Sequence, residues 1–187
     1  MKNVNAHLAI GATVLAVLFT AAPNAIAEET VCQGTIGAVS LDNIVVPDGR
    51  RCTLNGTQAN GSVVVGTGAS LTATDVSING NVQAEGARSV QVRGDSFVGG
   101  SIQIVQGRAA TIEGVSINAD LLFDENSRLL QAIGNSIGGN LQAFENTGGV
   151  RIVDNVIDGN LQCTGNAPAP TGGGNQASSK EDQCANL

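Results

Sequence analysis

Residues 139–163 read GNLQAFENTGGVRIVDNVIDGNLQC, and the phrase GNLQ that opens this stretch returns at 159–162. Related phrases occur earlier in the chain, as GNVQ at 80–83 and GSIQ at 100–103. One position, usually glycine, therefore recurs every 19 or 20 residues, at Gly61, Gly80, Gly100, Ala119, Gly139 and Gly159. A fixed period of this size is typical of repeat proteins, in which each unit buries its apolar side only by stacking on its neighbours.

Apolar and polar residues alternate after each recurring position, which is the pattern of a β-strand. Two residues on, the side chains are Val63, Val82, Ile102, Leu121, Leu141 and Leu161, and four residues on they are Val65, Ala84, Ile104, Phe123, Ala143 and Cys163. A second alternating segment follows in each period, and a third apolar column, from Ala59 to Ile157, precedes each recurring position by two residues. The sequence therefore predicts an all-β parallel β-helix, or β-solenoid, with three strands per coil and about six coils of 19–20 residues. We expect a right-handed helix, because the period does not fit a strict hexapeptide repeat.

Glycine and small polar residues mark the corners of these coils. We interpret the recurring glycines as residues that adopt positive φ angles in tight corners. The next residue is small and polar in every period, as Ser62, Asn81, Ser101, Asp120, Asn140 and Asn160. Stacked side chains of this kind can form hydrogen-bonded ladders that satisfy backbone groups between coils, so we assign this column a structural role.

The first 27 residues have the pattern of an export signal. Lys2 precedes an apolar stretch at 8–22, and Ala25, Ile26 and Ala27 give a small-x-small cleavage site. The alternative, a membrane anchor, requires a longer apolar run without such a site. We therefore predict a signal peptide at 1–27, a solenoid at 28–165 and a Gly/Pro/Asn-rich loop at 166–187. The mature protein is expected to be secreted, periplasmic or on the cell surface, with no membrane insertion after cleavage.

Charge and composition exclude several functions. The formal net charge is −7, and removal of Lys2 leaves 8 basic against 16 acidic residues, a net charge of −8. Nucleic acid and anionic lipid need a basic patch, so neither is expected as a partner. His7 is the only histidine and lies in the signal segment, and the chain has no Trp or Tyr. Imidazole chemistry is thus excluded from the mature protein.

Four cysteines in an exported chain predict two disulfides. Cys32 and Cys52 are 20 residues apart, and Cys163 and Cys184 are 21 apart. One period returns a solenoid to the same corner of the next coil, about 4.8 Å away, which a disulfide can span. We therefore predict the pairs Cys32–Cys52 and Cys163–Cys184, one at each end of the stack. The alternative, a zinc site, lacks the close cysteine pair that is typical of such sites.

The repeat over residues 32–165 resembles that of secreted bacterial right-handed parallel β-helix proteins. The C-terminal segments GNLQC at 159–163, PAPTGGGN at 168–175 and DQC at 182–184 resemble those of uncharacterised secreted bacterial β-solenoid proteins. This resemblance implies a fold and a location outside the cytoplasm, and it implies no activity.

Two groups of residues are candidate sites. The acidic group comprises Asp120, Asp124, Glu125 and Glu145, which could bind Ca²⁺ or a ligand if a cation or Arg128 relieves their repulsion. The alternative is a solvated acidic corner. The apolar group comprises Leu122, Ile133, Phe144 and Val153, which would form one contact patch if all four point outward. The alternative is packing within corners.

No catalytic residue is predicted, because the outward strand positions carry mainly neutral side chains such as Thr72, Gln91, Thr111 and Gln131, which cannot act as general acids or bases near neutral pH. The favoured function is a non-enzymatic structural, surface or interaction module, with a glycan or protein partner or self-association through the apolar patch. The alternative is a small carbohydrate-active β-helix enzyme of the polysaccharide lyase or hydrolase type that uses Asp120, Asp124, Glu125 and Arg151.

Overall fold

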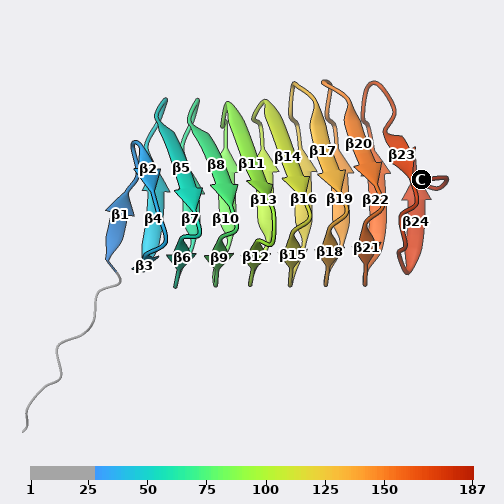
Figure 1. Cartoon of the computed structure of the whole chain (residues 1–187). Coiled ribbons are helices and arrows are strands. Elements are labelled where there is room, and N and C mark those ends of the chain that lie inside the picture. Colours follow the sequence, from blue (N-terminus) through green and yellow to red (C-terminus); the bar gives the residue numbers. More distant parts are fainter. Residues whose placement is uncertain (1–27) are drawn as a thin grey trace, which may run out of the picture.

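The computed structural model describes residues 28–187, and the predicted signal segment lies outside them. The chain winds into a parallel β-solenoid whose three sheets run along the stack (Figure 1). Neighbouring strands in each sheet pair in parallel, in registers such as Val82 with Ile102. Residues 28–187 contain no helix, and so no helix that could cross a membrane.

The sheets are named here A, B and C in the order in which each coil visits them. Sheet A consists of β1 (Glu29–Val31), β4 (Asn43–Val46), β7 (Val63–Val65), β10 (Val82–Glu85), β13 (Ile102–Val105), β16 (Leu121–Asp124), β19 (Leu141–Phe144), β22 (Asn160–Thr164) and β24 (Ser179–Asp182). Sheet B consists of β2 (Thr35–Ile36), β5 (Arg51–Asn55), β8 (Ser70–Thr74), β11 (Ser89–Arg93), β14 (Ala109–Glu113), β17 (Leu130–Ile133), β20 (Val150–Val153) and β23 (Thr171–Gly173). Sheet C consists of β3 (Ser40–Leu41), β6 (Gln58–Ala59), β9 (Ser77–Ile78), β12 (Phe97–Val98), β15 (Ser116–Ile117), β18 (Ser136–Ile137) and β21 (Val156–Ile157).

The number of coils is larger than predicted. With nine, eight and seven strands in the three sheets, the stack has about eight coils rather than six. The two extra coils lack glycine at the recurring corner. Asp42 takes this place in the first coil and accepts a hydrogen bond from the Gly61 N–H, while Ser178 takes it in the last coil and donates to the Gly159 carbonyl. A count based on glycine therefore omitted both ends.

The predicted inward columns form the core. Their side chains in sheets A and C are 3% exposed or less, and so are the alternating residues of sheet B, such as Leu71 and Ala73. Period-two alternation places these residues on one face of each strand, and the parallel register stacks like on like between coils. The apolar core is thus continuous from Ile44 in the second coil to Leu161 near the C-terminal end.

The recurring glycines have a different role from the one predicted. None of them has a positive φ angle. A Cβ atom at Gly159 would instead lie 2.5 Å from the Asn140 Oδ1 atom and 2.6 Å from the Gly139 carbonyl oxygen. Glycine is favoured at this corner because a side chain and the backbone of the preceding coil approach closely, and the one interior coil with a Cβ here, at Ala119, has the longest bonds of the corner.

The polar column that follows these glycines forms the predicted ladder, here called the C–A ladder. Each backbone N–H in this column donates to the side-chain oxygen one coil earlier, over 2.7 to 3.3 Å. The ladder begins at Asn43, one coil before the predicted column, and ends at Asn160. Its longest bond, from Asp120 to Ser101, lies where Ala119 replaces the usual glycine.

Two further asparagine ladders are buried and were not predicted. The A–B ladder comprises Asn126, Asn146 and Asn166 and ends on Gln183, and the B–C ladder comprises Asn135, Asn155 and Asn175. In both, an N–H donates to the side chain of the next coil, opposite to the direction of the C–A ladder. Each side-chain amide also donates to a carbonyl of an earlier coil, so these buried polar groups are satisfied.

Both ends of the stack are closed covalently. The structure confirms the disulfides Cys32–Cys52 and Cys163–Cys184, whose Cα atoms lie 5.5 and 5.3 Å apart. Residues 166–187, predicted as a loop, include β23 and β24, which add a strand to sheets B and A. Lys180 on β24 pairs with Leu161 and so occupies an inward column at the last coil. An inward-pointing charge at an edge strand discourages another strand from pairing there.

Candidate functional site

The structure does not gather the predicted acidic group into one site. Asp120 precedes β16 and Asp124 ends it, so roughly 13 Å of strand separates their backbones. The Asp120 carboxylate belongs to the C–A ladder, where it accepts hydrogen bonds from the backbone and side-chain amides of Asn140. Its role is therefore structural, as the column prediction implied.

Asp124, Glu125 and Glu145 lie at the corner between sheets A and B. Glu125 and Glu145 have positive φ angles, and the Glu125 carboxylate accepts a hydrogen bond of 2.9 Å from the Gln106 side chain. Partial burial, followed by repulsion from Glu125, raises the pKa of Asp124. Within residues 28–187 no group of three or more His, Cys, Asp or Glu side chains is arranged to hold a metal ion.

The predicted apolar patch divides between two sheets. Leu122 and Phe144 are outward residues of β16 and β19 in sheet A, whereas Ile133 and Val153 are register partners in sheet B. All four side chains are half-buried. They form two small pairs on different faces of the stack rather than one surface.

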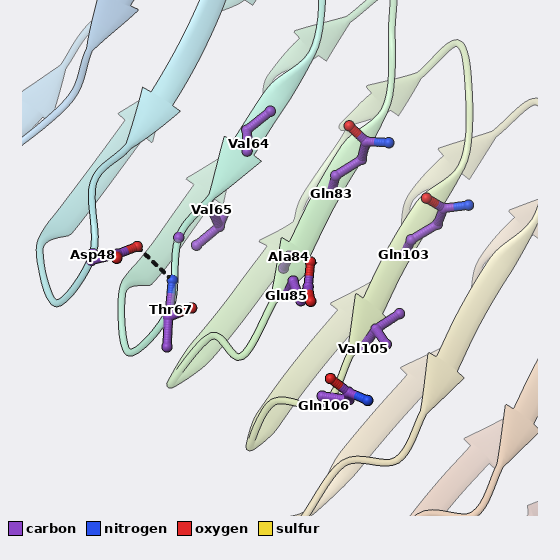
Figure 2. A pocket seen from close by; sticks show the side chains of 11 residues that line it. Asp48, Val64, Val65, Thr67, Gln83, Ala84, Glu85, Gln103, Val105 and Gln106 are labelled. Carbon is purple, nitrogen blue, oxygen red and sulfur yellow. Dashed lines mark hydrogen bonds between the residues drawn. The ribbon is translucent and has the colours of Figure 1, made fainter.

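A hollow with a volume of about 610 Å³ lies on the outer face of sheet A, a feature that sequence analysis missed. Its lining includes Asp48, Val64, Thr67, Gln83, Glu85, Gln103, Val105 and Gln106. Figure 2 shows Val64, Gln83 and Gln103 in a row across the neighbouring strands β7, β10 and β13. The one sequence signal for it was Val64, an apolar residue in a column otherwise rich in glutamine.

The chemistry of this hollow is mostly neutral. Gln83 and Gln103 present amide donors and acceptors beside Val64, whose side chain is 40% exposed. The Asp48 carboxylate accepts a hydrogen bond of 2.9 Å from the Thr67 N–H and so fixes the turn at one edge (Figure 2). Glu85 is the other carboxylate of the lining. The hollow can therefore offer hydrogen bonds and a small apolar contact to a hydroxyl-rich ligand.

The fold and these surfaces define a disulfide-bonded parallel β-solenoid. No protein-family model, curated protein or solved structure matches the chain. Its function must therefore be argued from its own surfaces.

Proposed function

We propose that this protein is a non-enzymatic binding module that takes an extended neutral glycan on the outer face of sheet A. The observation that carries the proposal is the hollow of about 610 Å³, whose floor is a row of glutamine amides and one valine. Amide groups on a β-sheet are held in fixed directions by their strands, so they can hydrogen-bond successive sugar hydroxyls without a large loss of side-chain entropy.

The distribution of carboxylates supports binding without catalysis. General acid–base catalysis needs two ionisable groups within reach of one bond. Asp120 is committed to a ladder, Asp48 holds a turn, and Arg151 lies on sheet B, away from the hollow. Glu85 then remains as a single carboxylate of the lining, and the amides around it do not exchange protons near neutral pH.

The two disulfides support a location outside the cytoplasm, because such bonds persist in oxidising compartments. They also join the first two and last two coils, where a solenoid frays most easily. We therefore propose a secreted or surface-attached protein that resists local unfolding and proteolysis.

One observation favours a second function, a small glycan-cleaving enzyme. Glu85 and Asp124 share the outward row of sheet A on either side of Val105, roughly 10 Å apart at the backbone. The pKa of Asp124 is raised, as a general acid requires. These two carboxylates replace the set predicted from sequence as the candidate pair.

A binding assay combined with a cleavage assay tests both functions. The full chain is expressed with export into an oxidising compartment and run in affinity gels that contain xyloglucan, galactomannan or dextran, with reducing ends measured in parallel. We expect retardation by at least one of these neutral polysaccharides and no release of reducing ends.

Matched variants locate the site. Replacing Gln83 and Gln103 by alanine should weaken binding about tenfold, since the hydrogen bonds of two amides to the ligand are lost. Replacing Gln142 and Gln162, in the same row but outside the hollow, should change binding less than about twofold. Absence of retardation by every polysaccharide would refute the proposal, and cleavage that disappears in Asp124→Asn would establish the enzyme instead.

A further inference from the structure

All seven arginines of the chain lie on sheet B or at the corner that leads into it. Arg51, Arg93 and Arg151 are in β5, β11 and β20. Arg50, Arg88 and Arg108 immediately precede β5, β11 and β14, and Arg128 precedes β17 by two residues. The outward strand positions of sheet B are mainly neutral, as predicted, but the corner beside them is basic. The arginines are scattered in sequence, and only the winding of the chain groups them.

Three of these residues form a ladder along the rod. Arg88, Arg108 and Arg128 are spaced by 20 residues and occupy the same corner of three successive coils. The Arg128 N–H donates to the Arg108 carbonyl over 3.2 Å, and the next residue after Arg108 is bonded in the same way to the Arg88 carbonyl. The positions are thus one inter-strand step, about 4.8 Å, apart. Gly148 follows Arg128 in the next coil and ends the series.

The guanidinium groups of this ladder are exposed and available. Arg88, Arg108 and Arg128 are exposed to solvent, and within residues 28–187 the only arginine side chain with a hydrogen-bond acceptor is Arg93, which donates to Gln91. Glu125 lies three residues before Arg128, and its carboxylate accepts a hydrogen bond from the Gln106 side chain. The ladder is therefore not neutralised by a hydrogen-bonded carboxylate of the described chain.

Charge is segregated between the sheets. The strands of sheet B contain one acidic residue, Glu113, whereas those of sheet A contain five, namely Glu29, Glu85, Asp124, Glu181 and Asp182. The strands of sheet C contain no charged residue. At the opposite corner Asp75, Asp95 and Asp154 follow the strands of sheet B, so the positive charge is concentrated on the side of the ladder, where a negative ligand would be selected by the local potential.

The row beside the ladder carries hydrogen-bonding side chains. Along the centre of sheet B the outward residues are Thr53, Thr72, Gln91, Thr111, Gln131 and Arg151, which pair in register from coil to coil. Ser70, Ser89, Ala109 and the exposed Leu129 lie between this row and the ladder. A ligand along the rod could therefore reach both the guanidinium groups and the hydroxyl and amide groups.

We propose that this face of sheet B, with the ladder Arg88–Arg108–Arg128 at its edge, binds a carboxylated polysaccharide that lies along the rod axis. Arginine pairs with carboxylate in a bidentate geometry, and a polymer with one carboxylate per sugar presents these groups in a series, as the ladder does. The hydroxyl groups of the same sugars match the central row of threonine and glutamine. The site is separate from the hollow on sheet A and has its own class of ligand.

Other polyanions fit this face less well. Single-stranded nucleic acid is usually bound by aromatic stacking next to basic residues, and the chain has no Trp or Tyr. An anionic membrane surface needs several basic residues and apolar side chains that insert. Sheet B supplies the basic residues but few apolar side chains, namely Leu129, which is 50% exposed, and the half-buried Ile133 and Val153. The central row of threonine and glutamine therefore favours a hydroxyl-rich polymer.

Affinity electrophoresis in polygalacturonate gels tests the site with the full, disulfide-bonded protein. We expect retardation at low salt that weakens as NaCl rises, and no retardation by fully methyl-esterified polygalacturonate, because esterification removes the carboxylate charges. Changing Arg88, Arg108 and Arg128 to glutamine should weaken binding about tenfold, as three exposed charge pairs are lost. The same variant should keep the thermal midpoint of the wild type, which shows that it is folded.

Matched controls separate a specific site from net charge. Lys180→Gln removes one positive charge away from sheet B and should change binding less than about twofold, in contrast to Arg108→Gln. Adding Glu28→Gln, Glu29→Gln and Asp158→Asn to the triple arginine variant restores the net charge and should not restore binding. The Gln83 and Gln103 alanine variant should bind polygalacturonate like the wild type.

Several outcomes would overturn this site. These are equal retardation of the triple arginine variant, equal binding of the esterified polymer, and tighter binding of single-stranded DNA or phosphatidylglycerol vesicles than of polygalacturonate. Retardation by a neutral polysaccharide alone would remove the acidic site and leave the proposed function intact. Retardation by no polysaccharide would remove both.

Discussion

Replacing Asn146 by alanine measures what the buried A–B ladder contributes to stability. The Asn146 side chain is fully buried, and it accepts from the backbone and side-chain amides of Asn126, at 2.9 and 3.0 Å, while it donates to the Phe123 carbonyl at 3.0 Å and to Asn166 at 2.8 Å. Alanine leaves the Asn126 N–H and the Phe123 carbonyl without these partners in the interior.

The expected loss follows from these two groups. A buried polar group without a partner costs about 1–3 kcal/mol, so we expect a total of about 4 kcal/mol. Small proteins have roughly 5–15 kcal/mol of stability in all, so the loss is a large share. With a urea m-value of about 2 kcal/mol/M, the midpoint of unfolding should fall by about 2 M at unchanged m.

The control is Asn118→Ala, because Asn118 is exposed at a corner and its side chain has no hydrogen bond within residues 28–187. It should change the free energy of unfolding by less than about 0.5 kcal/mol. A similarly small change in Asn146→Ala would refute the argument that the ladder stabilises the stack. Asn146→Asp adds a second check, because burial should raise the pKa of the new carboxyl. The loss in free energy of unfolding of Asn146→Asp should therefore be larger at neutral pH than in acid.

Three further changes test other parts of the fold. Gly159→Ala places a Cβ against the backbone and ladder oxygen of the preceding coil, and it should cost about 1–3 kcal/mol in urea unfolding, whereas an unchanged midpoint would contradict the close-approach argument. Cys184→Ser opens the C-terminal disulfide and should lower stability by about 2–4 kcal/mol, with earlier cleavage of residues 166–187 in limited proteolysis. Asp124 has a pKa raised above its usual value of 3.8, so its protonated form stabilises the folded state below that pH and this stabilisation is lost as pH rises. Asp124→Asn should therefore be slightly more stable than the wild type at pH 7, by less than about 0.5 kcal/mol, and the gain should vanish in acid; a gain that persists below pH 3.8 would contradict it.

The core was predictable because burial in this fold depends on a period of two within strands and a period of 19–20 between them. Ile102 and Ile104 show the period of two within a strand, and Ile102 and Leu121 show the period of 19 between strands. All three side chains are buried. The end coils were missed because their chemistry differs from that of the interior. Asp42 and Ser178 replace glycine there, and Lys180 replaces an apolar residue.

The outer surface was harder to predict than the core. The asparagines of the A–B ladder recur at exact intervals of 20, yet their burial was not foreseen, because asparagine at a turn is usually exposed. The arginines of sheet B were considered singly, as Arg128 near an acidic turn and Arg151 on a strand. Their common face depends on which corner each strand follows, and this is a property of the three-dimensional winding.

The opposite directions of the ladders have a consequence for how the gene can change. In the C–A ladder a side chain serves the coil after it, and in the buried ladders a side chain serves the coil before it. An insertion of one residue would shift the ladder partners on its two sides relative to each other, while all later coils keep their mutual spacing, and coils of 19 and of 20 residues already coexist in the stack. Duplication or loss of one complete coil would return each asparagine opposite an equivalent neighbour. Large differences in length between variants of this protein should therefore be close to whole coils, and each added coil at the middle of sheet B would lengthen the face available to a linear polymer.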